Sequence, residues 1–198
     1  MNKEDTNRGI LENLEILEWT IKEIPEFQFF GSELLKEKCL LFEENEFGQP
    51  EIKEMAKKMT DILKKYRKRN KIGAALAANQ IGINKSMIVA LLEGELKVLI
   101  NLKILGQEGK GSYWECCLSS GTLLIGKVIR AWQGVFEYRD IDGKKHTLEA
   151  DPMQTRLLLH EKEHLNGETC VEKYEPGTTR FTRGVEDIKS SGKLEKIE

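Results

Sequence analysis

The sequence predicts an α+β domain in which antiparallel strands pack around one central helix, with further helices towards the N-terminus. Apolar residues recur at helical spacing in the first third of the chain and again shortly before the C-terminal tail. Short apolar runs separated by turn residues occupy the middle of the chain. This order of helices, strands and one late helix favours an α+β domain over alternating βαβ units.

The composition limits the classes of protein to be considered. With 198 residues the chain can form one domain with a buried core. A net charge of -2 with 32% charged residues gives no overall attraction to nucleic acid or to an anionic membrane. The start MNKEDTNRGI lacks the apolar core of a signal peptide, and no apolar run approaches the roughly 18 residues of a membrane helix. Four cysteines without a disulfide-framework spacing favour a cytoplasmic protein with free thiols.

Two helices are predicted in the first third of the chain. The first covers residues 8–24 and ends before Pro25, and its apolar positions are Leu11, Leu14, Leu17 and Ile21. Pro50 fits the first turn of the second helix, whose buried face comprises Met55, Met59, Ile62, Leu63 and Tyr66. The basic end of this helix, KKYRKRNK, is expected to be a solvated face that compensates the helix dipole.

The strands and the last helix follow from local signals. SMIVALL and LKVLINL are predicted to pair as a hairpin, and GKVIRAWQ and GVFEYRDI as further strands. The aspartate-glycine pair in IDGKKHTLEA marks a turn between two strands. Asp151 and Pro152 begin the last helix, and Gly167 is placed to end it. We expect residues 1–30 to form a helical extension, residues 31–175 the domain, and residues 176–198 a mobile tail.

The stretch HEKEH carries the chemistry of the last helix. His160 and His164 are four residues apart, so they lie on the same face of a helix and can bind one metal ion. Glu161 lies beside them and can contact a metal-bound water. The pattern predicts a central metal-binding H-E-x-x-H helix, although two histidines leave the ion one protein ligand short. His146, in a turn, is expected to be a surface histidine.

The residues alone leave the third ligand open. Cys170 lies three residues after Gly167, where one group of zinc proteases carries its last histidine. Glu186 is a distant acidic candidate in the tail. The segment WECCLSS offers Cys116 and Cys117, which are adjacent and therefore poor disulfide partners. The alternative for this pair is two small buried residues without a ligand role.

Three stretches occur in a fixed order: GAALAANQ at 73–80, ECCLS at 115–119 and HEKEH at 160–164. With them the chain resembles the peptide deformylases, which remove the formyl group from the starting methionine of new polypeptides. The resemblance extends from about residue 32 to about residue 174. It implies that Cys117, His160 and His164 are the metal ligands and that Cys170 only packs. It also implies ferrous iron as the metal, while zinc or nickel would also suit these ligands.

The resemblance further implies roles for the neighbouring residues. Glu161 would act as general base and acid, while the Gln80 side chain and the Leu118 backbone N–H would stabilise the oxyanion. Substrate contacts are expected from Ala75, Glu115, Cys116, Arg156 and Leu157. The implied partner is an N-formylmethionyl peptide. Contact with the ribosome stays open, and contact with membranes or nucleic acid is not expected.

Four residues depart from the pattern of the family. Ala75 would be strained if its position required a positive φ, and Cys116 adds bulk beside the substrate. Glu163 lengthens a carboxylate near the metal by one methylene. Arg156 places a cation where the family has an apolar pocket, which is costly unless the charge is paired. We expect it either to turn outward, to pair with Glu115, or to recognise an acidic substrate.

These departures leave three other functions open besides a deformylase. One is a diverged amide hydrolase with a different substrate, another a metal-containing binding protein without catalysis, and the third a zinc endopeptidase. Glu161 favours an enzyme, because a purely structural metal site does not need a general base.

Overall fold

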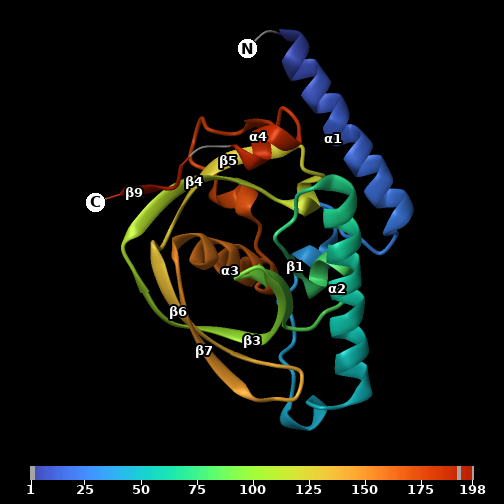
Figure 1. Ribbon diagram of the computed structural model, residues 1–198, viewed down its shortest axis with the longest axis vertical. Helices are drawn as coiled ribbons and strands as arrows, with labels where there is room; N and C mark the ends of the chain where they lie inside the picture. The colour runs from blue at the N-terminus through green and yellow to red at the C-terminus, as the bar shows by residue number, and fades with distance from the viewer. Residues whose placement is uncertain (1–2, 191–192, 198) are drawn as a thin grey trace.

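The computed structural model describes residues 3–190 and 193–197 and shows one helix enclosed by strands, with two long helices on the outside (Figure 1). The helices are α1 (Lys3–Glu23), α2 (Pro50–Asn70), α3 (Pro152–Leu165) and α4 (Val185–Lys189). The strands are β1 (Ala75–Ala77), β2 (Met87–Leu92), β3 (Glu95–Glu108), β4 (Lys110–Cys116), β5 (Leu124–Arg130), β6 (Gln133–Arg139), β7 (Lys145–Ala150), β8 (Arg180–Phe181) and β9 (Glu195–Ile197).

The strands form two antiparallel sheets. One sheet has the order β1-β2-β3-β6-β7, and the other has the order β8-β5-β4-β9. The hairpin predicted from SMIVALL and LKVLINL is β2–β3, in which Met87 lies opposite Ile100. The hairpin predicted around the aspartate-glycine turn is β6–β7. The α+β class with antiparallel strands is therefore confirmed.

Strand β2 of the five-stranded sheet is buried on both faces. In β2, Met87 and Val89 belong to a hydrophobic cluster with Met59 and other residues of α2. The alternating residues Ile88 and Ala90 belong to a second cluster with residues of α3. Two covered faces explain why β2 is apolar throughout and does not alternate with polar residues. This packing holds α3 in the interior, between the two sheets (Figure 1).

Both predicted ends of α3 are confirmed. The side chain of Asp151 accepts hydrogen bonds from the backbone N–H groups of Met153 at 2.9 Å and Gln154 at 2.8 Å. At the other end Gly167 has a φ of +80° just after the C-cap Asn166. A Cβ on Gly167 would lie 2.3 Å from the carbonyl oxygen of Lys36, so the turn has no room for a side chain.

The N-terminal helix packs against the last part of the chain. The Asn13 amide donates to the carbonyl oxygen of Thr182 at 3.3 Å, and α4 lies beside α1 (Figure 1). Gly9 is in close contact with Arg183, whose carbonyl carbon would lie 2.1 Å from a Cβ on that glycine. These contacts anchor part of the segment 176–198, in which the sequence shows few apolar anchors.

None of the helices in residues 3–190 and 193–197 combines the length and the hydropathy that a membrane crossing requires.

Candidate metal centre and active-site cleft

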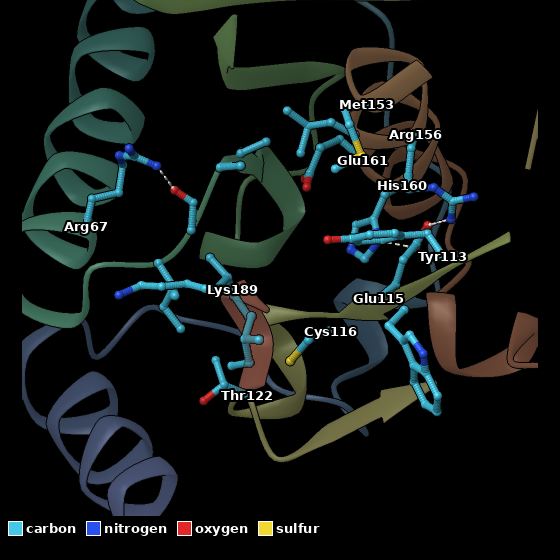
Figure 2. A pocket seen from close by; sticks show the side chains of 18 of the residues that line it. Arg67, Tyr113, Glu115, Cys116, Thr122, Met153, Arg156, His160, Glu161 and Lys189 are labelled. Carbon is cyan, nitrogen blue, oxygen red and sulfur yellow. Dashed lines mark hydrogen bonds and ion pairs between the residues drawn. The ribbon is translucent and has the colours of Figure 1, made fainter. Parts of the chain in front are cut away.

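A cleft of about 330 Å³ brings the three sequence motifs together. All five residues expected to contact substrate line it: Ala75, Glu115, Cys116, Arg156 and Leu157. Figure 2 shows Glu115, Arg156 and His160 grouped at one end of the cleft, while Arg67 and Lys189 lie at the other end. The cleft therefore has a charged network near the metal helix and a basic rim opposite.

The first motif forms one wall of the cleft. Gly73 has a φ of +96°, and a Cβ there would lie 3.2 Å from the Tyr66 ring. Ala75 lies in the extended strand β1. Among the described residues the non-glycine positions with positive φ are Lys71, Glu93, Asn101 and Thr122. Ala75 is not one of them, so its methyl group causes no backbone strain.

Gln80 is buried beside the second motif and is not an exposed loop residue. It lies in the 3-10 turn η3 (Ala78–Ile81). Its Oε1 accepts a hydrogen bond from the Ala77 N–H at 2.8 Å, which orients the amide. Its Nε2 lies 3.0 Å from Ser119 Oγ and 3.8 Å from Cys117 Sγ. The donor end of the amide therefore points towards the proposed metal ligands.

The three expected ligands are close neighbours. Cys117 is 1% exposed and directly follows β4. Its Sγ lies 3.1 Å from His164 Nε2. The rings of His160 and His164 are arranged edge to face, with their centroids 5.2 Å apart. One thiol and two imidazoles thus converge from two elements, which is a donor set that fits a divalent metal ion.

A second thiol lies in the same place. The Sγ atoms of Cys117 and Cys170 and a ring nitrogen of His160 all lie within 4.8 Å of one another. His164 is not part of this group of three and joins the site through its contact with Cys117. The structure therefore brings both cysteine candidates for the third ligand to the site. Glu186, the acidic candidate, is exposed on α4 and pairs with Lys189 at 2.8 Å, so it plays no part here.

Glu115 is the centre of the charged network. Its carboxylate accepts from Arg130 Nε at 2.7 Å and Nη2 at 2.8 Å, and from His160 Nδ1 at 3.0 Å. Burial alone would raise the pKa of Glu115, but the charge and hydrogen bonds of Arg130 hold this pKa far below its ordinary value. Because Glu115 occupies Nδ1, His160 presents its other ring nitrogen, Nε2, to a metal.

Arg156 is buried and paired with Glu115, so the expected alternative of pairing is confirmed and that of turning outward is wrong. The residue is 4% exposed, and its Nη1 forms an ion pair with Glu115. The guanidinium also donates to the carbonyl oxygens of Val128 at 3.0 Å and Gly111 at 2.8 Å, and lies 5.7 Å from the centroid of the Tyr113 ring. The wall at this end of the cleft is therefore built from a cation and an aromatic ring.

Arg130 and Tyr174 complete the site, and sequence reasoning missed both. Arg130 bridges Glu115 and Glu163, and Glu163 also pairs with Lys173 at 2.8 Å. The only signal for Arg130 in the sequence was a charged residue within the predicted strand GKVIRAWQ. The structure shows that this side chain is buried. The Tyr174 hydroxyl donates to the carbonyl oxygen of Glu115 at 2.9 Å.

Glu161 has the environment of a general base. It is buried, and within the described chain its Oε2 has no hydrogen-bond partner. Burial raises the pKa of Glu161 above its ordinary value, and nearby positive charges oppose this only in part. A carboxylate with a raised pKa accepts a proton more readily near neutral pH.

His146 lies away from the cleft. It is partly exposed, pairs with Asp140 at 2.7 Å and stacks on the ring of Tyr138. This partial exposure is as expected of a surface histidine, but His146 lies in β7 and not in the turn.

Comparison with known proteins decides the family. A family model described as polypeptide deformylase matches residues 24–180. The chain belongs to the peptide deformylase family. Members of this family depend on a metal ion, and the cluster of thiol and imidazole groups described above provides a place for one.

Individual deformylases show the extent of the similarity. The enzyme of Dictyoglomus thermophilum is 31% identical over 150 residues, covering 76% of this chain and 92% of its own length. That of Thermoanaerobacter pseudethanolicus is 37% identical over 101 residues, and the match spans 63% of it, less than two thirds of its length.

Solved deformylase structures agree with the fold. The deformylase of Synechococcus elongatus, solved in complex with actinonin, has 30% sequence identity and a TM-score of 0.68, covering 76% of this chain and 79% of that one. The deformylase of Thermus thermophilus has 28% identity and a TM-score of 0.67, covering 76% of this chain and 85% of that one.

Proposed function

We propose that the protein is a metal-dependent hydrolase that removes the formyl group from N-formylmethionyl peptides and releases formate. The observation that carries this proposal is the convergence of Cys117, His160 and His164 beside Glu161, whose buried Oε2 has no partner in the part of the chain that the structure describes. This arrangement joins a metal site to a general base at the side of one cleft.

The metal would be held by Cys117, His160 and His164. When bound, a divalent ion supplies a Lewis acid and activates a water molecule near neutral pH. The combination of one thiolate and two imidazoles supports ferrous iron as our first assignment, and zinc and nickel also suit it. The Glu115 carboxylate holds Nδ1 of His160 at 3.0 Å and so orients this ligand.

The protein's own residues would carry the proton and stabilise the developing charge. Glu161 takes the proton of the attacking water and delivers a proton to the departing amine. Gln80 Nε2 donates to the former carbonyl oxygen, and its amide is already oriented by the bond from Ala77. Leu118 begins the 3-10 turn η4 (Leu118–Ser120), where the first backbone N–H groups have no partner within the turn. The Leu118 N–H is our second donor.

The substrate main chain would lie along β1. This strand is at the edge of the five-stranded sheet, so its outer side can accept an added strand. The first side chain of the peptide would then enter the end of the cleft lined by Arg156, Leu157 and Tyr113. Ala75 and Cys116 would flank the peptide backbone.

The buried Arg156 favours a second candidate, an amide hydrolase of the same type with an altered substrate. A charged group in the wall can donate to a polar side chain that an apolar pocket would reject. The two candidates share the metal site and the role of Glu161, and they differ only in which peptide reacts fastest.

Formate release from formyl-Met-Ala-Ser tests the proposal. Protein is prepared anaerobically with ferrous iron, its metal content is measured, and Glu161→Ala is the control. Rapid release by the wild type and its loss in the variant would support a deformylase. A protein that holds one metal per chain and releases no formate would overturn it, and a series of formyl peptides with other first residues would then test the second candidate. We assign the reaction to the cytoplasm, and co-sedimentation with ribosomes would test contact with them.

A further inference from the structure

Cys170 lies closer to the metal centre than a packing role requires. It begins the 3-10 turn η5 (Cys170–Lys173), and its side chain is buried. Its Sγ, that of Cys117 and a ring nitrogen of His160 lie within 4.8 Å of one another. Two sulfurs bound to one tetrahedral ion lie about 3.8 Å apart, given metal–sulfur bonds of about 2.3 Å. A small movement would therefore bring both thiolates onto the same ion.

Packing around Tyr174 fixes this position of Cys170. The Tyr174 ring lies directly on Gly126 of β5, where a Cβ would be 2.4 Å from the ring. The Tyr174 hydroxyl donates to the carbonyl oxygen of Glu115 at 2.9 Å. Both contacts hold η5 against the hairpin β4–β5 that also carries Cys117. Cys170 is therefore held over the metal centre by the same framework as the expected ligand.

Cys116 provides an internal comparison. It is adjacent to Cys117 in sequence and lines the cleft. Its Sγ lies 3.9 Å from the carbonyl oxygen of Cys117, and it is not part of the cluster formed by Cys117, His160 and Cys170. Proximity in sequence does not place its thiol at the site, whereas the fold places Cys170 there from 53 residues further along, counted from Cys117 to Cys170.

We propose that Cys170 is a fourth protein ligand of the resting metal ion, so that two thiolates and two imidazoles hold it. This inference rests on the ligands of the proposed function and adds one to them. A set of two sulfurs and two nitrogens in a tetrahedron is the preferred environment of zinc, so Cys170 shifts the selectivity of the site from ferrous iron towards zinc.

A fourth ligand also closes the position that the attacking water needs. For the proposed reaction Cys170 must leave this position as water enters. When it does not bind the metal, the Cys170 thiol can donate to the Tyr174 hydroxyl oxygen, which lies 3.6 Å from its sulfur. Tyr174 can accept this bond because its own hydroxyl hydrogen is donated to the carbonyl oxygen of Glu115. Cys170 therefore has a ready hydrogen-bond partner in the open state.

The test counts sulfur ligands and measures metal affinity under anaerobic, reducing conditions. X-ray absorption of the zinc-loaded wild type distinguishes two sulfur neighbours, as expected, from one, which would overturn the inference without any mutation. The variants Cys170→Ser and Cys116→Ser are then titrated with cobalt and with zinc against a competing chelator. We expect Cys170→Ser to lose about half of the thiolate-to-cobalt absorption and to bind zinc at least roughly tenfold more weakly. Cys116→Ser should match the wild type.

The controls separate this inference from the proposed function. If Cys170→Ser matches the wild type in both titrations, Cys170 is only a packing residue. Cys117→Ser should lose the metal under either outcome, and a variant that kept it would instead contradict the ligand set of the proposed function.

Discussion

The guanidinium of Arg156 forms a buried ion pair with the carboxylate of Glu115, and the same carboxylate accepts a hydrogen bond from His160. One acidic group therefore neutralises the cation in the cleft wall and orients His160, a proposed ligand of the metal. A substitution at residue 156 should therefore change metal binding as well as substrate binding.

Arg156→Leu should destabilise the protein by about 1–3 kcal/mol. Removing the only partner of a buried charge would destabilise the protein more. Here Arg130 still pairs with Glu115 and neutralises its charge. Urea unfolding of the metal-loaded protein measures the change. Arg139→Leu is the matched control, because Arg139 pairs with the exposed Glu44 and such pairs contribute little. Equal losses in the two variants would show that burial of the Arg156 pair has no energetic role.

Glu161→Gln should keep the metal and lose formate release by at least about a hundredfold. The amide cannot take the proton of the attacking water, although it has nearly the same shape as the carboxylate. Metal analysis and formate release are measured on the same sample. Glu163→Asp serves as the comparison and should remain active, because it keeps a carboxylate near Arg130. An active Glu161→Gln protein would remove Glu161 from the mechanism.

Gln80→Glu should lower kcat by about 10²–10³ with a much smaller change in KM. The substitution retains an oxygen for the Ala77 N–H, which now lies 2.8 Å from Gln80 Oε1, but it replaces the donor that faces the oxyanion. Steady-state formate release gives both constants. Thermal unfolding shows whether the variant is still folded. An unchanged kcat in a folded variant would exclude Gln80 as a donor to the oxyanion.

Gly126→Ala should destabilise the protein by about 1–3 kcal/mol, because its methyl group would overlap the Tyr174 ring. Gly106→Ala is the control, since no atom lies within 4 Å of a Cβ at that position. Denaturant midpoints compare the two. A second substitution, Tyr174→Ala, should make the loss from Gly126→Ala smaller than it is in the wild-type background. Additive losses would contradict the contact.

The attachment of α4 should weaken in acid. Burial raises the pKa of Asp187, but hydrogen bonds from Arg180 and Arg183 outweigh this and hold it below its ordinary value of 3.8. A lowered pKa means that Asp187 stabilises the folded state fully above about 3.8, and that this contribution is lost as the pH falls through the folded-state pKa. Hydrogen exchange of residues 180–189 at pH 6 and pH 3 measures the effect. Asp187→Asn should show fast exchange already at pH 6.

Local signals were sufficient to predict much of the fold. The caps of α3 and the two hairpins depend on residues close to one another in the chain, and all of them were found from the sequence. The spacing of four residues that places His160 and His164 on one face of α3 is an equally local signal. The spacing of Cys170 after Gly167 made it one candidate for the third ligand, but its place at the site depends on the contact of Tyr174 with Gly126 across two elements. No spacing in the sequence reports such a contact.

Charged residues were the least predictable part of the site. Arg130 and Arg156 are both buried, and each forms an ion pair with the same carboxylate, Glu115. A charge within a strand or on a helix usually indicates the solvent-exposed side. Only the three-dimensional arrangement shows that these two charges have a common partner. Gln80 was assigned to the site from the resemblance alone, and its burial beside Cys117 is what distinguishes it from an exposed loop glutamine.

The contact between Asn13 and Thr182 joins positions 169 residues apart. During synthesis the residues of α1 are made well before their partner segment around Thr182. Contacts of such high sequence separation form slowly, since a long loop must close before they are gained. Ile188 and Lys189, which follow this segment, line the cleft. A chain that has not yet been made as far as this segment lacks part of the cleft lining, so it cannot bind a peptide in the finished cleft.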